Sequence, residues 1–236
     1  MKLKFILAAA TMVASTAIGA QPIVPVAPRT ADGQTLVIPA KQRSMGTAYY
    51  ALTNKDRQVY FESDAPLEKI KGQSNKVVGY AVVSPGSSGM IVAGEWHLPV
   101  ESMKTGIKLR DHHLTTKDWL DAESFPEIVF QIRNVTDVKE VKKTAAFASY
   151  TATLVGDMTL HGETHSISIP KSTITLMNES DATRKVAPGN LMAIRSKFSV
   201  KLSDYGVSHP VIGKKVADEV ALDVSLYMST VPLKKP

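Results

Sequence analysis

The chain has 236 residues and a net charge of +6, with 28 Lys and Arg against 22 Asp and Glu, and it contains no cysteine. The missing cysteines exclude disulfides, thiolate catalysis and cysteine-ligated zinc or iron–sulfur sites. The basic residues are spread along the chain rather than gathered in a block, so the sequence predicts no nucleic-acid partner. A chain of this length can bury one good-sized core.

Residues 1–20 resemble a secretory signal peptide. Lys2 and Lys4 precede an apolar run from Phe5 to Ala14, and small residues then lead to a cleavage site after Ala20. The sequence therefore predicts an exported protein, and the leader is of the kind that directs bacterial proteins to the periplasm. Residues 21–47 contain four prolines and are predicted to form a loose N-terminal arm, and residues 231–236 a tail.

The body of the chain alternates between apolar and polar residues. Two long stretches show this best, with even-numbered apolar positions facing polar neighbours: Met192, Ile194, Phe198, Val200 and Leu202, then Val220, Leu222, Val224, Leu226 and Met228. A period of two indicates strands with one wet face. Shorter runs follow the same rule, so about eight or nine strands with short connections are expected. This pattern predicts an all-β fold, an antiparallel barrel or sandwich.

One segment departs from the alternation. Leu114, Trp119, Leu120 and Phe125 recur at helical spacing, and Thr115 followed by Asp118 resembles a capping box. Pro126 then returns the chain to a strand. A short helix is therefore predicted over residues 115–125, placed as a lid near one end of the barrel.

The chemistry-bearing residues do not assemble into a known catalytic motif. His113, His161 and Asp111 form a conceivable ligand set for a transition metal, which leaves a metal-dependent extracytoplasmic enzyme as an alternative. His161 and His165 flank a predicted hairpin turn. No metalloprotease helix and no nucleophile elbow is present, so ordinary hydrogen-bonded histidines and no enzymatic activity are the favoured interpretation.

Four ordered blocks resemble the YceI-like family over residues 48–230. The first begins at Val59, the second is TGIKLRDHHLTTKDWLDAESFPEIVF, the third is YTATLVGDMTLHGETHSISI, and the fourth joins LMAIRSKFSVKLSDYGV to GKKVADEVALDVSLYM. The resemblance implies an extended, lipocalin-like antiparallel barrel that holds a polyisoprenoid, an isoprenoid quinone or a fatty-acid derivative in the periplasm. It implies no cofactor other than this bound lipid.

The resemblance also suggests where a ligand would bind. Family positions fall on Arg110, Asp111 and His113, on Trp119, Phe125 and Phe130, and on Leu160, His161 and Tyr205; Leu202 and Leu120 depart from the family pattern. The inward face expected from the alternation is aliphatic, with Met158, Leu160, Met192, Ile194, Phe198, Leu222, Val224 and Leu226. The predicted ligand-binding residues are Arg110, Asp111, His113, Trp119, Phe125, Phe130, Met158, Leu160, His161, Ile194, Phe198 and Tyr205, with the polar head of the lipid near the first three.

The sequence leaves one further alternative, a stress-related interaction protein whose barrel is filled by its own side chains. The sequence leaves open a transient contact with a membrane surface and a homodimer, and its mild basic charge favours a solvated surface over attraction to anionic lipids.

Overall fold

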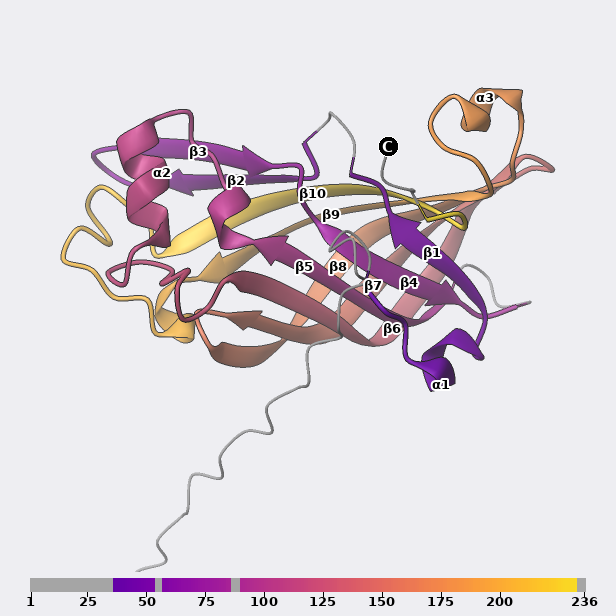
Figure 1. The fold of residues 1–236 in the computed structure, drawn as a ribbon, viewed down its shortest axis with the longest axis horizontal. Helices are drawn as coiled ribbons and strands as arrows, with labels where there is room; N and C mark the ends of the chain where they lie inside the picture. The colour runs from indigo at the N-terminus through magenta and orange to yellow at the C-terminus, as the bar shows by residue number, and fades with distance from the viewer. Residues whose placement is uncertain (1–35, 54–56, 86–89, 233–236) are drawn as a thin grey trace, which may run out of the picture.

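The computed structural model describes residues 36–53, 57–85 and 90–232, and their main element is one antiparallel sheet (Figure 1). The expected signal peptide, most of the expected arm and the end of the expected tail lie outside these ranges. The strands of the sheet are β1 (Thr47–Ala51), β2 (Val59–Asp64), β3 (Lys69–Ser74), β4 (Val78–Val83), β5 (Ile91–Pro99), β6 (Glu127–Lys143), β7 (Phe147–Leu160), β8 (Glu163–Met177), β9 (Leu191–Lys201) and β10 (Glu219–Ser229).

The sheet closes into a barrel, which confirms the predicted fold class. Eight strands form the ring in the order β1-β4-β5-β6-β7-β8-β9-β10, and β10 then pairs with β1 through Tyr50–Ser229 and Ala51–Met228. An eight-stranded antiparallel barrel leaves a lumen that either fills with side chains or holds one small ligand. The state of that lumen therefore decides what the fold can do.

A hairpin of β2 and β3 extends the wall beside β10. β2 pairs with the first half of β10, whereas β1 pairs with its last residues, so the two strands share one edge of β10 in succession. Gln58, which is 1% exposed, fixes this branch point: its amide nitrogen donates to the carbonyl oxygens of Leu52 and Val77, and its amide oxygen accepts from the Val77 N–H. At the free edge of β3, Gln73 and Lys104 exchange two backbone hydrogen bonds of 2.8 and 2.9 Å.

The helix near the barrel end begins and ends earlier than predicted. α2 spans Lys108–Thr115, and residues 116–124 form turns instead of a helix. The Thr115 and Thr116 hydroxyls donate backward to the carbonyl oxygens of His112 and His113, both at 2.8 Å, so they occupy the end of a helix rather than its beginning. The predicted helix over 115–125 was therefore wrong in position, because a threonine can bond to either side along the chain.

The strand β8 runs through Pro170 without ending there. The pairing of β7 with β8 shifts between Ala152 and Leu154, opposite Pro170 and Lys171, and Lys171 has a φ of 55°. A bulge is the place where a sheet tolerates proline, because the ladder hydrogen bond is already missing there. The β7–β8 hairpin turns at His161 and Gly162, whose φ values of 51° and 80° fit a two-residue turn.

The outer face of β4 and β5 is covered by the described part of the predicted arm. Leu36 and Ile38 are buried with Tyr50, Val78 and Tyr80. α1 (Ala40–Arg43) adds hydrogen bonds from Arg43 to the Tyr50 hydroxyl and from the Tyr80 hydroxyl to Gln42. The remaining short helices are η1 (Val100–Ser102), α3 (Asp181–Arg184) and η2 (Ser203–Tyr205). No helix in the described ranges has both the length and the apolar character that crossing a membrane requires.

Candidate functional site: an apolar lumen with a polar mouth

The barrel lumen holds two adjoining cavities. A narrow inner cavity of about 120 Å³ lies within the ring of strands, and an outer cavity of about 490 Å³ continues to the barrel end under α2. Five side chains line both cavities, so the two adjoin: Met103, Ile128, Leu160, Val200 and Leu222. Ligand sites commonly measure about 300–1,000 Å³, so the outer cavity falls in this range and the inner cavity is a narrow extension of it.

The wall of the inner cavity is almost entirely apolar. Seven of the eight residues that the alternation placed inward line it, and the eighth, Met192, is fully buried in the surrounding core. The one hydroxyl on this wall belongs to Ser196, which lies 2.8 Å from Ser172. Because Ser172 donates to the Ile169 carbonyl oxygen, Ser196 supplies the proton between the two hydroxyls. His97 also borders this cavity, but both of its ring nitrogens bond to Glu95 and Glu127. The other lining residues are apolar, so the wall favours hydrocarbon.

Aromatic rings lie flat on glycines along this wall. A methyl group added at Gly79 would stand 2.5 Å from the Trp96 ring, and one at Gly156 would stand 2.7 Å from the Phe130 ring. Trp96 and Phe130 also stack, with ring centroids 6.2 Å apart. Since a glycine leaves space where another residue would place a side chain, the rings take that space and the centre of the lumen stays open.

Arginine, lysine and glutamate side chains border the mouth, the barrel-end opening of the outer cavity. Arg110 and His113 line this cavity from α2, and Lys215 lines it from the loop before β10. Arg110 forms a 2.5 Å ion pair with Glu68 of the β2–β3 turn. This pair ties α2 to the hairpin and places a guanidinium group beside the opening.

Asp111 lies on the other side of α2, away from the lumen. Its carboxylate accepts hydrogen bonds of 2.6 Å from both the backbone N–H and the hydroxyl of Thr105. Burial acts to raise the pKa of Asp111, but the Thr105 hydrogen bonds and the charges of Lys104 and Arg110 outweigh it, so the pKa lies below its usual value. Asp111 thus fixes the loop that leads into α2.

Phe125, His161 and Tyr205 gather beside the β7–β8 turn, also outside the lining. The rings of Phe125 and His161 meet edge to face at 5.2 Å, and His161 Nδ1 donates to the Tyr205 carbonyl oxygen at 3.1 Å. The Tyr205 ring is 2% exposed and contacts His165 at 5.0 Å. Burial, followed by the charge of Asp204, raises the pKa of Tyr205 to about 12. This cluster joins three loops at the barrel end.

The predicted ligand-binding residues therefore divide into two groups. Eight line the joined cavities: Arg110, His113, Trp119, Phe130, Met158, Leu160, Ile194 and Phe198. Four do not: Asp111, Phe125, His161 and Tyr205. Positions of the family pattern occur in both groups. A sequence pattern does not distinguish a residue that shapes the barrel end from one that contacts a ligand.

The proposed metal ligands His113, His161 and Asp111 have three separate surroundings. His113 borders the outer cavity, His161 bonds to Tyr205, and Asp111 bonds to Thr105. Among the residues that the structure describes, no three His, Asp or Glu side chains are grouped as a metal would need.

Several lining residues were missed by the sequence analysis. The β2–β3 hairpin contributes Phe61, Glu68 and Ile70, and the segment after β5 contributes Met103. The strand β3 was not predicted at all, although its buried positions alternate. The alternation Ile70-x-Gly72-x-Ser74 could have indicated it, but a glycine in the middle weakens the strand pattern.

The fold recurs in solved structures with low sequence identity. Burkholderia cenocepacia BcnA matches with a TM-score of 0.53 and 16% identity, over 76% of this chain and 95% of that one. A Campylobacter jejuni YCEI protein matches at 0.51 and 16%, over 73% and 90%. A Saccharophagus degradans protein described as a polyisoprenoid binding domain matches at 0.53 and 12%, over 78% and 98%.

The sequence itself matches one family model. No curated protein matches significantly, but the model of the YceI-like domain matches residues 50–228, which include every strand that lines the lumen. The closed barrel, the hollow apolar lumen and this match together show that the chain belongs to the YceI-like family.

Proposed function

We propose that this protein is a periplasmic carrier that holds a long apolar lipid, such as a polyisoprenoid, an isoprenoid quinone or a fatty-acid derivative, in the barrel lumen. The observation that carries the proposal is the pair of adjoining cavities in the barrel, whose inner lining is apolar apart from Ser196 and His97. Each buried CH₂ group contributes about 0.8 kcal/mol, so six such groups already contribute about 5 kcal/mol. The fold is shared with a polyisoprenoid binding domain, which supports the same ligand class.

In this proposal the polar head of the lipid lies at the mouth. Arg110, His113 and Lys215 border the outer cavity and can donate hydrogen bonds to a phosphate, a carboxylate or a quinone oxygen. Asp111 faces away, so it positions α2 rather than contacting the head. No covalent chemistry is involved, and the protein acts by binding.

The bound ligand can be identified directly. Protein purified without detergent is denatured, extracted with organic solvent and analysed by mass spectrometry, and its cellular fraction and mature N-terminus are determined in parallel. The proposal expects a long-chain lipid near one per chain, recovery from the periplasm and a chain beginning at Gln21. Repeated absence of lipid, together with no uptake of a fluorescent quinone or fatty acid, would contradict it.

A bulky side chain in the lumen separates an open barrel from a filled one. Leu222 lines both cavities, and we expect Leu222→Trp to weaken probe binding at least about tenfold because the indole occupies the space of the ligand. The free energy of unfolding should change by less than about 1 kcal/mol, whereas overpacking a filled core costs about 1–3 kcal/mol. Ala221→Trp, on the exposed outer face of the same strand, is the control and should keep normal binding.

A further inference from the structure

The barrel end around the mouth exposes large apolar side chains. Leu67, in the β2–β3 turn, is 72% exposed, and Ile107 and Leu109, at the start of α2, are 50% and 65% exposed. We call these three residues the apolar rim. Single exposed apolar residues are common on soluble proteins, but a group of them at the opening of a cavity indicates an interaction surface.

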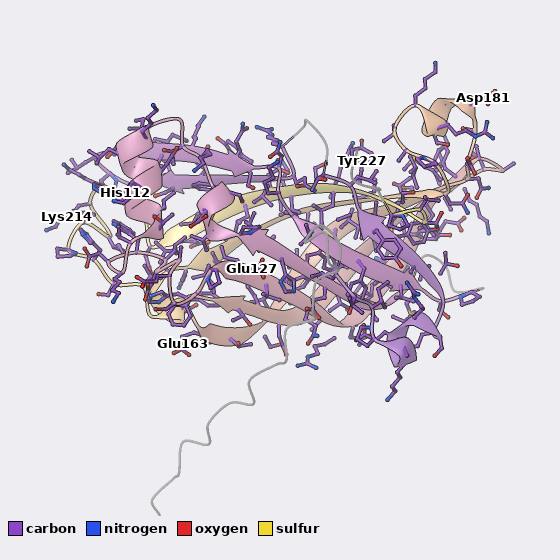
Figure 2. All side chains as sticks on the ribbon, in the orientation of Figure 1. His112, Glu127, Glu163, Asp181, Lys214 and Tyr227 are labelled. Carbon is purple, nitrogen blue, oxygen red and sulfur yellow. The ribbon has the colours of Figure 1, made fainter. Side chains whose placement is uncertain are left out.

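The apolar rim is connected to the mouth by specific contacts. Ile107 and Leu109 also line the outer cavity. Leu67 is held beside the loop before β10 by a hydrogen bond from its N–H to the Lys214 carbonyl oxygen at 3.0 Å, and the next residue, Glu68, pairs with Arg110 of α2. Figure 1 shows α2 and the β2–β3 turn together at one end of the barrel, and Figure 2 places His112 and Lys214 there and Asp181 at the opposite end.

Basic side chains surround the apolar rim. Lys108, Lys214 and Lys215 are exposed, and none forms an ion pair with another described residue. The nearest carboxylates of the hairpin are already engaged, since Glu68 pairs with Arg110, and Asp64 pairs with Lys69 at 3.2 Å. The lysines are therefore available to negative charges outside the protein.

The opposite end also exposes apolar and basic side chains. Val141 and Val186 are 62% and 55% exposed there. Arg184 binds both Glu179 and Asp181, but Lys139, Lys142, Lys143 and Lys185 are exposed and form no ion pair with another described residue. Exposed apolar side chains next to unpaired lysines are the two features by which proteins bind an anionic bilayer at its interface. Among the residues that the structure describes, the mouth is where these two features border the opening of a cavity.

We propose that the apolar rim, together with Lys108, Lys214 and Lys215, docks the mouth on the surface of an anionic lipid bilayer. Leu67, Ile107 and Leu109 enter the headgroup region while the lysines contact lipid phosphates. The mouth then faces the bilayer, so a lipid passes between membrane and lumen without crossing water. This inference rests on lipid carriage for its purpose, but the docking can be measured separately.

The test uses flotation with vesicles of phosphatidylglycerol and phosphatidylcholine, and with vesicles of phosphatidylcholine alone. We expect the full chain to bind the anionic vesicles, with binding that weakens as salt is raised. A rim variant, Leu67→Ser with Lys108→Glu and Lys214→Glu, should lose at least about tenfold in vesicle binding. None of these three residues lines the cavities, so uptake of a soluble quinone probe should be unchanged.

A matched control carries the same kinds of change away from the mouth, Val186→Ser with Lys139→Glu and Lys185→Glu, and should bind vesicles normally. Equal vesicle binding by both variants, or no binding by the unmodified chain, would overturn the docking proposal even if probe uptake persists. Absence of probe uptake with vesicle binding intact would instead overturn lipid carriage and leave docking standing. A dimer in solution that the rim variant converts to a monomer would assign the surface to a second copy and overturn the proposal.

Discussion

The two faces of β5 are both buried but carry opposite chemistry. Trp96 and Leu98 point into the lumen and line its apolar wall. Glu95 and His97 point outward, where His97 Nε2 lies 2.7 Å from Glu95 and His97 Nδ1 lies 2.7 Å from Glu127 of β6. His97 is 0% exposed and Glu95 is 3% exposed. A strand covered on both sides thus directs the bonds of its ionisable side chains away from the lumen, although His97 also borders the inner cavity.

A barrel with buried ionisable groups can therefore still have a largely apolar inner cavity. The register of the sheet separates the two sets, since His97 pairs with Val78 and Val129, whereas Trp96 pairs with Gly79 and Phe130. Directly paired residues share a face, so the outer set stays on the outside along three strands. The buried polar network on the outer face stabilises the barrel wall, and the apolar inner face borders the cavity.

The largest expected effect comes from removing the centre of the outer network. His97→Ala takes away a hydrogen-bond partner from two carboxylates at once, and breaking a buried charged network typically costs about 3–5 kcal/mol. The free energy of unfolding, measured with urea, should fall by that amount, while the folded fraction still binds a lipid probe. His112→Ala, at an exposed position of α2, should change stability by less than about 0.5 kcal/mol. A loss of probe binding by folded His97→Ala protein would contradict the separation of the two faces.

A smaller effect is expected from the inner face. Gly79→Ala places a methyl group 2.5 Å from both the Glu95 carbonyl oxygen and the Trp96 ring. The ring must shift toward the lumen and the backbone must adjust, which costs about 1–3 kcal/mol. Unlike His97→Ala, this variant should also weaken probe binding, because the displaced indole narrows the cavity. Normal binding in a titration would show that Trp96 does not set the width of the lumen.

The smallest expected effect is a fall in the free energy of unfolding at alkaline pH, caused by Tyr80 on the outer face of the sheet. Burial, and then the charge of Glu95, raises the pKa of Tyr80 well above its ordinary value near 10. A raised pKa contributes stability that is fully present below pH 10 and is lost as the pH rises toward the folded-state pKa. We expect the unfolding free energy to decline above pH 10, and less steeply in Tyr80→Phe.

At neutral pH, Tyr80→Phe should cost about 1 kcal/mol, because the hydroxyl no longer donates to Gln42. Tyr60→Phe, at a partly exposed tyrosine of β2, is the control and should keep the slope of the unmodified chain. Equal alkaline slopes in the unmodified chain and Tyr80→Phe would show that another group governs the decline.

Much of the barrel could be predicted from local patterns, because alternation over a dozen residues survives in β9 and β10 without knowledge of their partners. The same local information failed at Thr115, where the direction of a side-chain hydrogen bond depends on the conformation of the following residues. It also missed β3, whose burial depends on Phe61 lying over Gly72 across the hairpin. His97 was expected to be an ordinary hydrogen-bonded histidine, and its bonds to Glu95 and Glu127 confirm this.

The candidate site was harder to predict than the fold. Lys215 and Glu68 reach the mouth from segments that are distant in sequence, and no spacing rule connects them to α2. Asp111 has the polar character of a binding residue, and only its bonds to Thr105 reveal that it faces elsewhere. The residues of the lumen follow from the strand period, whereas those of the mouth depend on how three loops meet.

The rings that rest on glycines have a consequence for how such barrels diversify. The width of the lumen depends on a few glycines that lie against aromatic rings, such as Gly79 against Trp96 and Gly156 against Phe130. Replacing one of these rings by a smaller side chain would widen the lumen while every pair of neighbouring strands stays hydrogen-bonded. The width of the lumen and the pairing of the strands can therefore change independently. The width can evolve to fit a thicker or thinner ligand while the strand pairing is conserved.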